Sequence, residues 1–184
     1  GNAAVPRSTP RRGAGVIERR RRAGRAIVRS ADGRVLMIRG EDPDDRERGG
    51  FWFTPGGGLD DGESVEAGVR RELLEETGLE VASVGPVVLR RRDRFPMLGE
   101  VWLQEETIHL IEVAEVFEPS TAGHHEIEAS VTTELRWLSA TELRTLDEEY
   151  SPTGLVELLE ELDAAGPPSE PWFEDLTYRM RDEE

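Results

Sequence analysis

Three glutamates, Glu72, Glu75 and Glu76, have the clearest potential for chemistry in this sequence. They lie at positions i, i+3 and i+4 near the end of segment 64–77, whose pattern predicts a helix. Like charges at these spacings each destabilise a helix by about 0.2–0.5 kcal/mol, and the helix dipole disfavours anions at its C-terminal end. The spacing therefore indicates that a cation stabilises this cluster.

The apolar face of the same helix points the same way. Val65, Val69 and Leu73 form one stripe on a helical wheel. Glu76 falls within that stripe, and Glu72 lies at its margin. A carboxylate directed toward an apolar interior is unfavourable unless it is paired, so the wheel also favours a cationic partner.

Two interpretations of the cluster remain open from these residues. It is either a solvated acidic face, partly neutralised by Arg70 and by Arg71, which is an i, i+4 partner of Glu75, or a divalent metal site. Carboxylate oxygens suit magnesium, which usually binds one or two carboxylates and completes its octahedron with water and substrate phosphates.

A longer motif surrounds the helix. From Gly57 the chain reads GGLDDGESVEAGVRRELLEETGL. This is Gly57, five residues, Glu63, seven residues, Arg71-Glu72-Leu73, one residue, Glu75-Glu76, one residue and Gly78-Leu79. Over these 23 residues the chain resembles the signature of the Nudix hydrolases at every defined position. The resemblance covers about residues 25–165.

The resemblance implies an α/β fold, an α/β/α sandwich on a mixed β-sheet that carries the motif as strand, loop, helix and loop. It implies that Glu72, Glu75 and Glu76 bind metal, and that Arg71 and Glu63 form an ion pair that orients the cluster; these five are the implied catalytic residues. Gly57 and Gly58 would let the loop approach the substrate closely, as glycine permits.

The implied reaction is attack of a metal-activated water on phosphorus. Two or three magnesium ions, or manganese in their place, lower the pKa of the water and stabilise the developing charge. The substrate would be a small nucleoside diphosphate derivative such as ADP-ribose, a nucleotide sugar or a (d)NTP. The motif sets the reaction class, whereas the loops set the substrate.

Other candidate residues lie outside the motif. Trp52 could stack on a base or belong to the core, and Arg92 could contact a substrate phosphate or balance an acidic surface. Glu126 and Glu128, in a polar loop, could supply a further carboxylate as ligand or base, or could be solvated.

The remaining pattern predicts the elements that position the site. Ala26 to Val28 and Val35 to Ile38 predict a hairpin around Asp32-Gly33. Residues 90–99 are expected to form a basic loop, and 101–103 and 107–116 two strands joined through 104–106. A last strand is expected at 135–138, followed by a short helix capped at Ser139 and a longer helix from Pro152. We expect a basic, disordered arm over 1–23, the Nudix domain over 24–165, and an acidic, Pro-rich tail over 166–184.

Composition excludes several functions. The 184 residues include no cysteine, which rules out disulfides and thiolate catalysis, and all 23 basic residues are arginine, which rules out lysine chemistry. The net charge is −16, so nucleic-acid binding by the folded part is not expected. No membrane-spanning run or signal peptide is evident, and we expect a cytoplasmic protein; a homodimer is left open.

Two functions compete with hydrolysis of a small nucleotide. A Nudix-like domain could sense a nucleotide without cleaving it, although the intact motif disfavours this. The arginine-rich arm could instead direct the same chemistry to RNA 5′ ends.

Overall fold

The computed structural model describes residues 18–41, 47, 49–97, 100–120 and 132–180. The described strands and helices are β1 (Glu18–Ser30), β2 (Val35–Glu41), β3 (Gly50–Phe53), β4 (Gly56–Gly58), α1 (Val65–Thr77), β5 (Val87–Met97), β6 (Glu100–Val113), β7 (Thr132–Leu138), α3 (Ala140–Arg144), β8 (Glu149–Ser151), α4 (Leu155–Ala165), β9 (Trp172–Asp175) and the 3₁₀ helix η2 (Thr177–Met180).

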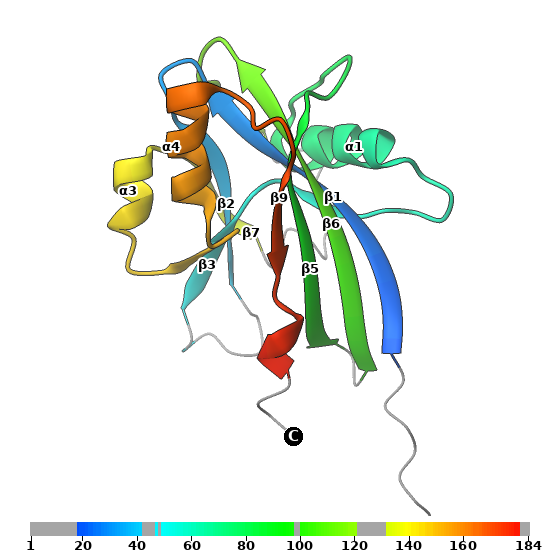
Figure 1. The fold of residues 1–184 in the computed structure, drawn as a ribbon. Coiled ribbons are helices and arrows are strands. Elements are labelled where there is room, and N and C mark those ends of the chain that lie inside the picture. Colours follow the sequence, from blue (N-terminus) through cyan, green and yellow to red (C-terminus); the bar gives the residue numbers. More distant parts are fainter. Residues whose placement is uncertain (1–17, 42–46, 48, 98–99, 121–131, 181–184) are drawn as a thin grey trace, which may run out of the picture.

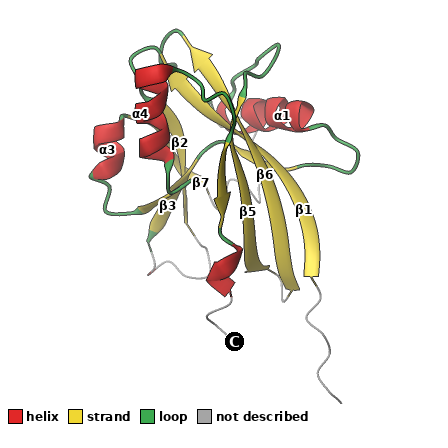
Figure 2. Cartoon of the chain, viewed as in Figure 1, coloured by secondary structure: helices red, strands yellow, loops and turns green. Residues whose placement is uncertain are grey.

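Within these residues the strands form one mixed sheet of nine, in the order β8-β3-β2-β1-β6-β5-β9, with β4 paired to β1 and β7 paired to β2 (Figure 1). The pairs β1–β6, β3–β8 and β5–β9 are parallel, and the others are antiparallel. Helix α1 lies on one side of the sheet, and α3 and α4 lie on the other (Figure 2). The predicted α/β/α sandwich on a mixed sheet is confirmed.

Strand β1 shows why both faces of the sheet are covered. Its successive side chains point to opposite faces, and apolar residues occupy both. Ile27 belongs to the core cluster that includes the leucines of α4. Ala26 and Val28 belong to the cluster formed with Val69 and Leu73 of α1. The strand is thus a central one between two helical layers.

The ends of α1 follow the sequence prediction. The Ser64 side chain accepts from the Ala67 amide as the N-cap, and Gly78 ends the helix in the left-handed region with a φ of 75°. The hairpin turn at Gly33 (φ 85°) and the capping box of Ser139 and Glu142 are also confirmed. Helix α4, however, begins at Leu155 rather than at Pro152.

The predicted boundary of the N-terminal arm is wrong, because β1 begins at Glu18. Residues 18–23 pair with β6 in register, starting at Glu18 and Val101. The arginine run has no apolar alternation to reveal a strand, but it meets carboxylates across the sheet, as in the ion pair between Arg19 and Glu100 at 3.0 Å. Residues 1–17 lie outside the described part of the chain.

Two loop predictions are also wrong, because charged residues again form strands in which they pair with opposite charges. Residues 90–97 belong to strand β5, and 104–106 lie inside β6, which continues without a turn. Their charges face each other across the two strands. Arg91 Nη1 donates to Glu106 at 2.9 Å, and Arg92 Nη2 donates to Glu105 at 3.2 Å. Cross-strand pairs of opposite charge stabilise a sheet, so a polar composition does not exclude strands here.

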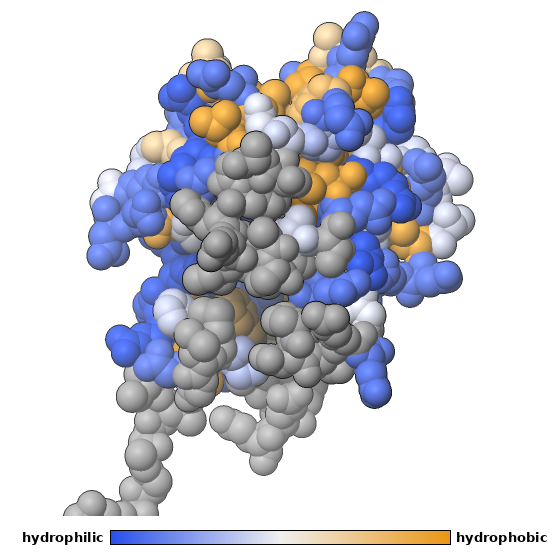
Figure 3. Space-filling model, turned by 180° about the vertical axis from the view of Figure 1, so that it is seen from behind, coloured by the Kyte–Doolittle hydropathy of each residue, from blue (hydrophilic) through white to orange (hydrophobic). Residues whose placement is uncertain are grey.

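The C-terminal segment is part of the domain rather than a tail from residue 166. Strand β9 pairs with β5, Trp172 packs against the core cluster that includes the leucines of α4, and Leu176 is buried. A short segment after a Pro-rich stretch carries too little periodicity to predict this strand. Figure 3 shows the molecule from behind, where hydrophilic residues cover most of the described surface and apolar residues form small patches.

Leu176→Ala should lower the free energy of unfolding by about 2–4 kcal/mol, because it removes a side chain that is only 4% exposed. The matched control is Phe173→Ala in the same segment. Phe173 is 63% exposed, and we expect its loss to change stability by less than about 0.5 kcal/mol. Urea unfolding of both variants measures the difference, and equal effects would show that this segment does not pack as described.

Candidate active site

The motif helix brings its charged residues to the loop that precedes it. Glu72 is buried, and Glu75 and Glu76 are half-buried. Their backbone positions follow from the capped helix, which fixes the i, i+3, i+4 spacing on one side. Glu72 is thus more enclosed than the helical wheel predicts, because strand β4 passes over it.

Arg71 joins four of the motif positions. Its Nε and Nη2 donate to the two oxygens of Glu63 at 2.9 and 3.0 Å. Its Nη1 donates to Glu72 Oε1 at 2.8 Å and to Glu75 Oε2 at 3.4 Å. Nη2 also donates to the Gly58 carbonyl at 3.2 Å. The planar guanidinium fork therefore ties the loop to two of the helix carboxylates.

Arg71 also sets the protonation state of Glu63. The hydrogen bonds from Arg71, together with the Asp60 amide at 2.9 Å, lower the pKa of Glu63 to about 2. Glu63 is consequently ionised throughout the neutral range and holds Arg71 as a fixed ion pair. The predicted pairing of these two residues is present in the structure.

Glycines carry the loop across the carboxylates. A Cβ atom at Gly57 would lie 2.8 Å from Glu72 Oε1, so any side chain at residue 57 would displace that carboxylate. The amide of Gly56 donates to Glu76 Oε2 at 2.8 Å. A backbone amide thus helps to orient the third glutamate.

The arrangement fits magnesium bound through pairs of carboxylates. Glu72 and Glu75 converge on one atom, Arg71 Nη1, whereas Glu76 turns toward Gly56. In the described part of the chain, no three acidic or histidine side chains surround a single point. Magnesium usually takes only one or two protein carboxylates and leaves its other positions to water and substrate phosphates, so oxygen donors in this arrangement suit it.

Trp52 does not lie in the site, which contradicts its candidacy for stacking on a base. It is 2% exposed and belongs to the core. Its Nε1 donates to Glu148 Oε1 at 3.1 Å, and the Arg136 guanidinium lies 5.2 Å from its ring centroid. Strand β3 runs between β2 and β8, which encloses the indole.

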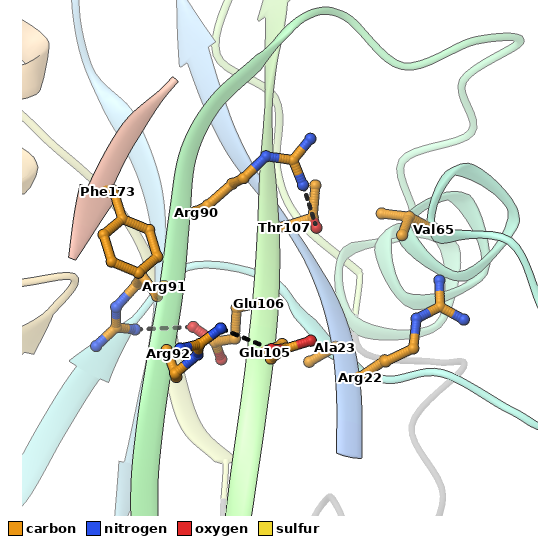
Figure 4. A pocket seen from close by; sticks show the side chains of 10 residues that line it. All are labelled: Arg22, Ala23, Val65, Arg90, Arg91, Arg92, Glu105, Glu106, Thr107 and Phe173. Atoms are coloured by element: carbon orange, nitrogen blue, oxygen red, sulfur yellow. Dashed lines mark hydrogen bonds and ion pairs between the residues drawn. The ribbon is translucent and has the colours of Figure 1, made fainter. Parts of the chain in front are cut away.

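Arg92 lines a different hollow, a pocket of about 330 Å³ between α1, the β1–β6–β5 part of the sheet and Phe173 (Figure 4). Four arginines and two glutamates share this pocket: Arg22, Arg90, Arg91, Arg92, Glu105 and Glu106. None of the three helix glutamates lines it. The structure therefore does not join Arg92 to the carboxylate cluster. Glu126 and Glu128 lie outside the described residues.

Two charged residues outside the predicted set, Arg25 and Glu106, lie behind the motif. Arg25 donates through Nη1 to the Thr54 and Gly56 carbonyls at 3.0 and 3.3 Å. Its Nε donates to Glu106 at 2.8 Å. The available signal was a single arginine in the apolar run Ala23 to Val28, since an unpaired charge is costly in a central strand.

Solved structures share the fold of this layered sheet with helices on both faces. A MutT protein from Methanosarcina mazei Go1 matches with a TM-score of 0.54 at 21% identity, covering 80% of this chain and 95% of that one. A MutT Nudix hydrolase from Burkholderia pseudomallei matches with a TM-score of 0.52 at 25% identity, covering 78% and 98%.

Sequence comparison gives the family. The NUDIX domain model matches residues 19–166. A MutT-like protein of Streptomyces ambofaciens is 34% identical over 141 residues, which cover 77% of this chain and 76% of the relative. A putative 8-oxo-dGTP diphosphatase 2 of Mycobacterium tuberculosis is 35% identical over 101 residues, 55% of this chain and 62% of that protein. The chain belongs to the Nudix family and is a Nudix pyrophosphohydrolase. In the described part of the chain, no helix is both long and apolar enough to cross a membrane.

Arg71→Lys should lower kcat/KM at least about tenfold although it keeps the charge, because one ammonium group cannot replace the fork that reaches Glu63, Glu72 and Glu75. The control is Arg70→Lys on the same helix. Arg70 is exposed and donates to the Val81 carbonyl, so its replacement should leave kcat/KM nearly unchanged. If Arg71→Lys kept wild-type activity, the guanidinium fork would not be needed to position the carboxylates, and Arg71 would act only as a surface charge.

Proposed function

We propose that this chain hydrolyses a phosphoanhydride bond of a small nucleoside diphosphate derivative, in a reaction that depends on Mg²⁺ and accepts Mn²⁺. The proposal depends on one observation: hydrogen bonds hold all three helix glutamates in place beside the glycine segment. Arg71 draws Glu72 and Glu75 to one point, and the Gly56 amide holds Glu76 nearby. Rigidly held oxygen donors next to a glycine loop suit metal ions that bridge to phosphates.

In this proposal Glu72, Glu75 and Glu76 hold the metal. When bound, the metal supplies charge stabilisation at phosphorus and lowers the pKa of the attacking water. The protein residues position these ligands. Glu63 stays ionised and fixes Arg71, and Arg71 in turn fixes Glu72 and Glu75. Gly57 and Gly58 leave room for the substrate phosphates to approach the loop.

The substrate proposal rests on charge and on the relatives. A chain with a net charge of −16 repels a nucleic-acid backbone, whereas metal ions can mediate contact with a small phosphorylated molecule. Three candidate substrates are (d)NTPs, ADP-ribose and nucleotide sugars. Because relatives are named as a MutT-like protein and as putative 8-oxo-dGTP diphosphatases, we favour (d)NTPs among them. We infer a free nucleotide rather than an RNA end as the substrate.

A product screen tests the proposal. The full chain is incubated with Mg²⁺ and a panel of (d)NTPs, 8-oxo-dGTP, ADP-ribose, nucleotide sugars and a 5′-triphosphorylated RNA, and the nucleotide products are separated. We expect release of a nucleoside monophosphate with at least one free nucleotide, and loss of that product with EDTA. Turnover of the RNA alone, or metal-independent turnover, would contradict the proposal.

A further inference from the structure

A row of alternating charges runs through the sheet beside the motif. Glu106 of β6 is 4% exposed and accepts from Arg25 Nε at 2.8 Å, Arg91 Nη1 at 2.9 Å and Gln104 Nε2 at 2.7 Å. Arg91 continues the row to Glu174 of β9 at 2.6 Å. A buried carboxylate is costly unless it is paired and hydrogen-bonded, and these three donors satisfy that requirement.

Arg25 is the end of this row that reaches the motif. Its Nη1 donates to the Thr54 and Gly56 carbonyls, and its backbone pairs with Gly56 in the β1–β4 ladder. The amide of the same Gly56 donates to Glu76 at 2.8 Å. A single glycine therefore links Arg25 to the Glu76 carboxylate. Arg25 contacts Gly56 through the strand pairing of its backbone and through the hydrogen bond of its side chain.

The charge on Arg25 is secure enough to serve as an anchor. Burial alone would lower the pKa of Arg25, but Glu106, and behind it Glu76 and Glu72, raise it above its ordinary value. The guanidinium therefore stays protonated, and it donates to the two carbonyls in the structure. The Gly56–Gly58 segment gains a fixed geometry from such a charge-assisted hydrogen bond.

A second arginine on β1, Arg29, forms ion pairs away from the motif and serves for comparison. Arg29 lies four residues along, on the same face of the strand, and pairs with Glu112 at 3.3 Å and with Asp163 of α4. Its side chain is 14% exposed, against 19% for Arg25. Among the residues that the structure describes, Arg29 makes no hydrogen bond to the motif loop, so it is a matched control.

We propose that Arg25 is a positioning residue: held by Glu106, it fixes the Gly56 peptide and thereby sets the orientation of Glu76 for metal binding. This inference rests on the proposed function, in which Glu76 is a metal ligand. Hydrogen-bond partners of ligands typically change metal affinity or activity by about 10–100-fold when they are removed, so Arg25 is expected to act on that scale without touching metal or substrate.

The test is a double-variant cycle read by Mn²⁺ binding, with loss of the free-ion electron paramagnetic resonance signal as the measure. Arg25→Met should weaken Mn²⁺ binding about tenfold in the wild type and should have no further effect in a Glu76→Gln background. Arg25→Lys should recover little, because one ammonium group cannot reach Glu106 and both carbonyls. Arg29→Met should leave Mn²⁺ binding unchanged.

Kinetics and a second substitution complete the test. Arg25→Met should lower kcat more than it raises KM, because the substrate itself is not contacted. Should Arg25→Met fail to fold, Arg25→Lys and Glu106→Gln carry the same cycle, since both keep a hydrogen-bonding group at the position. Equal effects of Arg25→Met and Arg29→Met, or effects of Arg25→Met and Glu76→Gln that simply add, would overturn the role of Arg25. Coupled Mn²⁺ binding in a protein that cleaves no nucleotide would support that role while removing the proposed function.

Discussion

Glu75→Gln and Glu76→Gln should each lower kcat by at least about 100-fold, a loss of roughly 2.7 kcal/mol in transition-state stabilisation. Glutamine keeps the size of the side chain and one acceptor oxygen, so the contacts with Arg71 Nη1 and the Gly56 amide can persist. What would disappear is the negative charge that, in the proposed function, holds the metal and, with it, the activated water. Steady-state rates on the best substrate of the panel, with circular dichroism as a check of folding, measure the effect.

The control for this prediction is Glu66→Gln. Glu66 lies in the first turn of the same helix and is exposed, so its neutralisation changes the charge of the protein by the same amount at a distance from the cluster. We expect its kcat to stay within about twofold of wild type. More than a tenth of wild-type activity in both Glu75→Gln and Glu76→Gln would disprove the metal-ligand assignment.

The motif could be predicted from the sequence because its geometry is local. The spacing of Glu63, Arg71, Glu72 and Glu75 places them on one loop and one helix, and the caps at Ser64 and Gly78 fix where that helix begins and ends. The resemblance to the family motif implies that Arg71 lies beside Glu63, and the structure places them in contact.

The residues behind the motif could not be predicted, because their partners are distant in the sequence. Arg25 and Glu106 are 81 residues apart, and Glu106 falls in Gln104-Glu105-Glu106, which resembles a polar turn. Only the parallel pairing of β1 with β6 turns these polar residues into a satisfied buried network. The sequence predicts a loop over residues 90–99 on the same ground, since the arginines of β5 gain carboxylate partners only after β6 and β9 are placed beside them.

The role of Trp52 stays open from the sequence for a different reason. The sequence shows Trp52 between two phenylalanines in a short strand but not which side of that strand becomes the core. Alternation alone leaves the choice open when both neighbours are aromatic. The structure buries Trp52 against Glu148 and leaves Phe51 40% exposed.

Magnesium should raise the melting temperature of the wild type and should do so far less in the double variant Glu75→Gln/Glu76→Gln. An ion that binds the folded cluster and not the unfolded chain stabilises by RT ln(1 + [Mg]/Kd), or about 2.7 kcal/mol at 100-fold excess over the dissociation constant. For a domain of this size that corresponds to a shift of roughly 5–10 °C. The double variant lacks two of the three charges and should lose most of this shift.

Without metal, the double variant should melt at or slightly above the temperature of the wild type. Neutralising two carboxylates relieves their mutual repulsion and their conflict with the helix dipole, while glutamine oxygens can still accept from Arg71 and Gly56. Thermal melts of both proteins with EDTA and with magnesium measure all four states. A metal-free variant that melts several degrees lower would show that the charges of Glu75 and Glu76 stabilise the fold itself. Equal magnesium shifts in both proteins would place the stabilising ion elsewhere on this acidic chain.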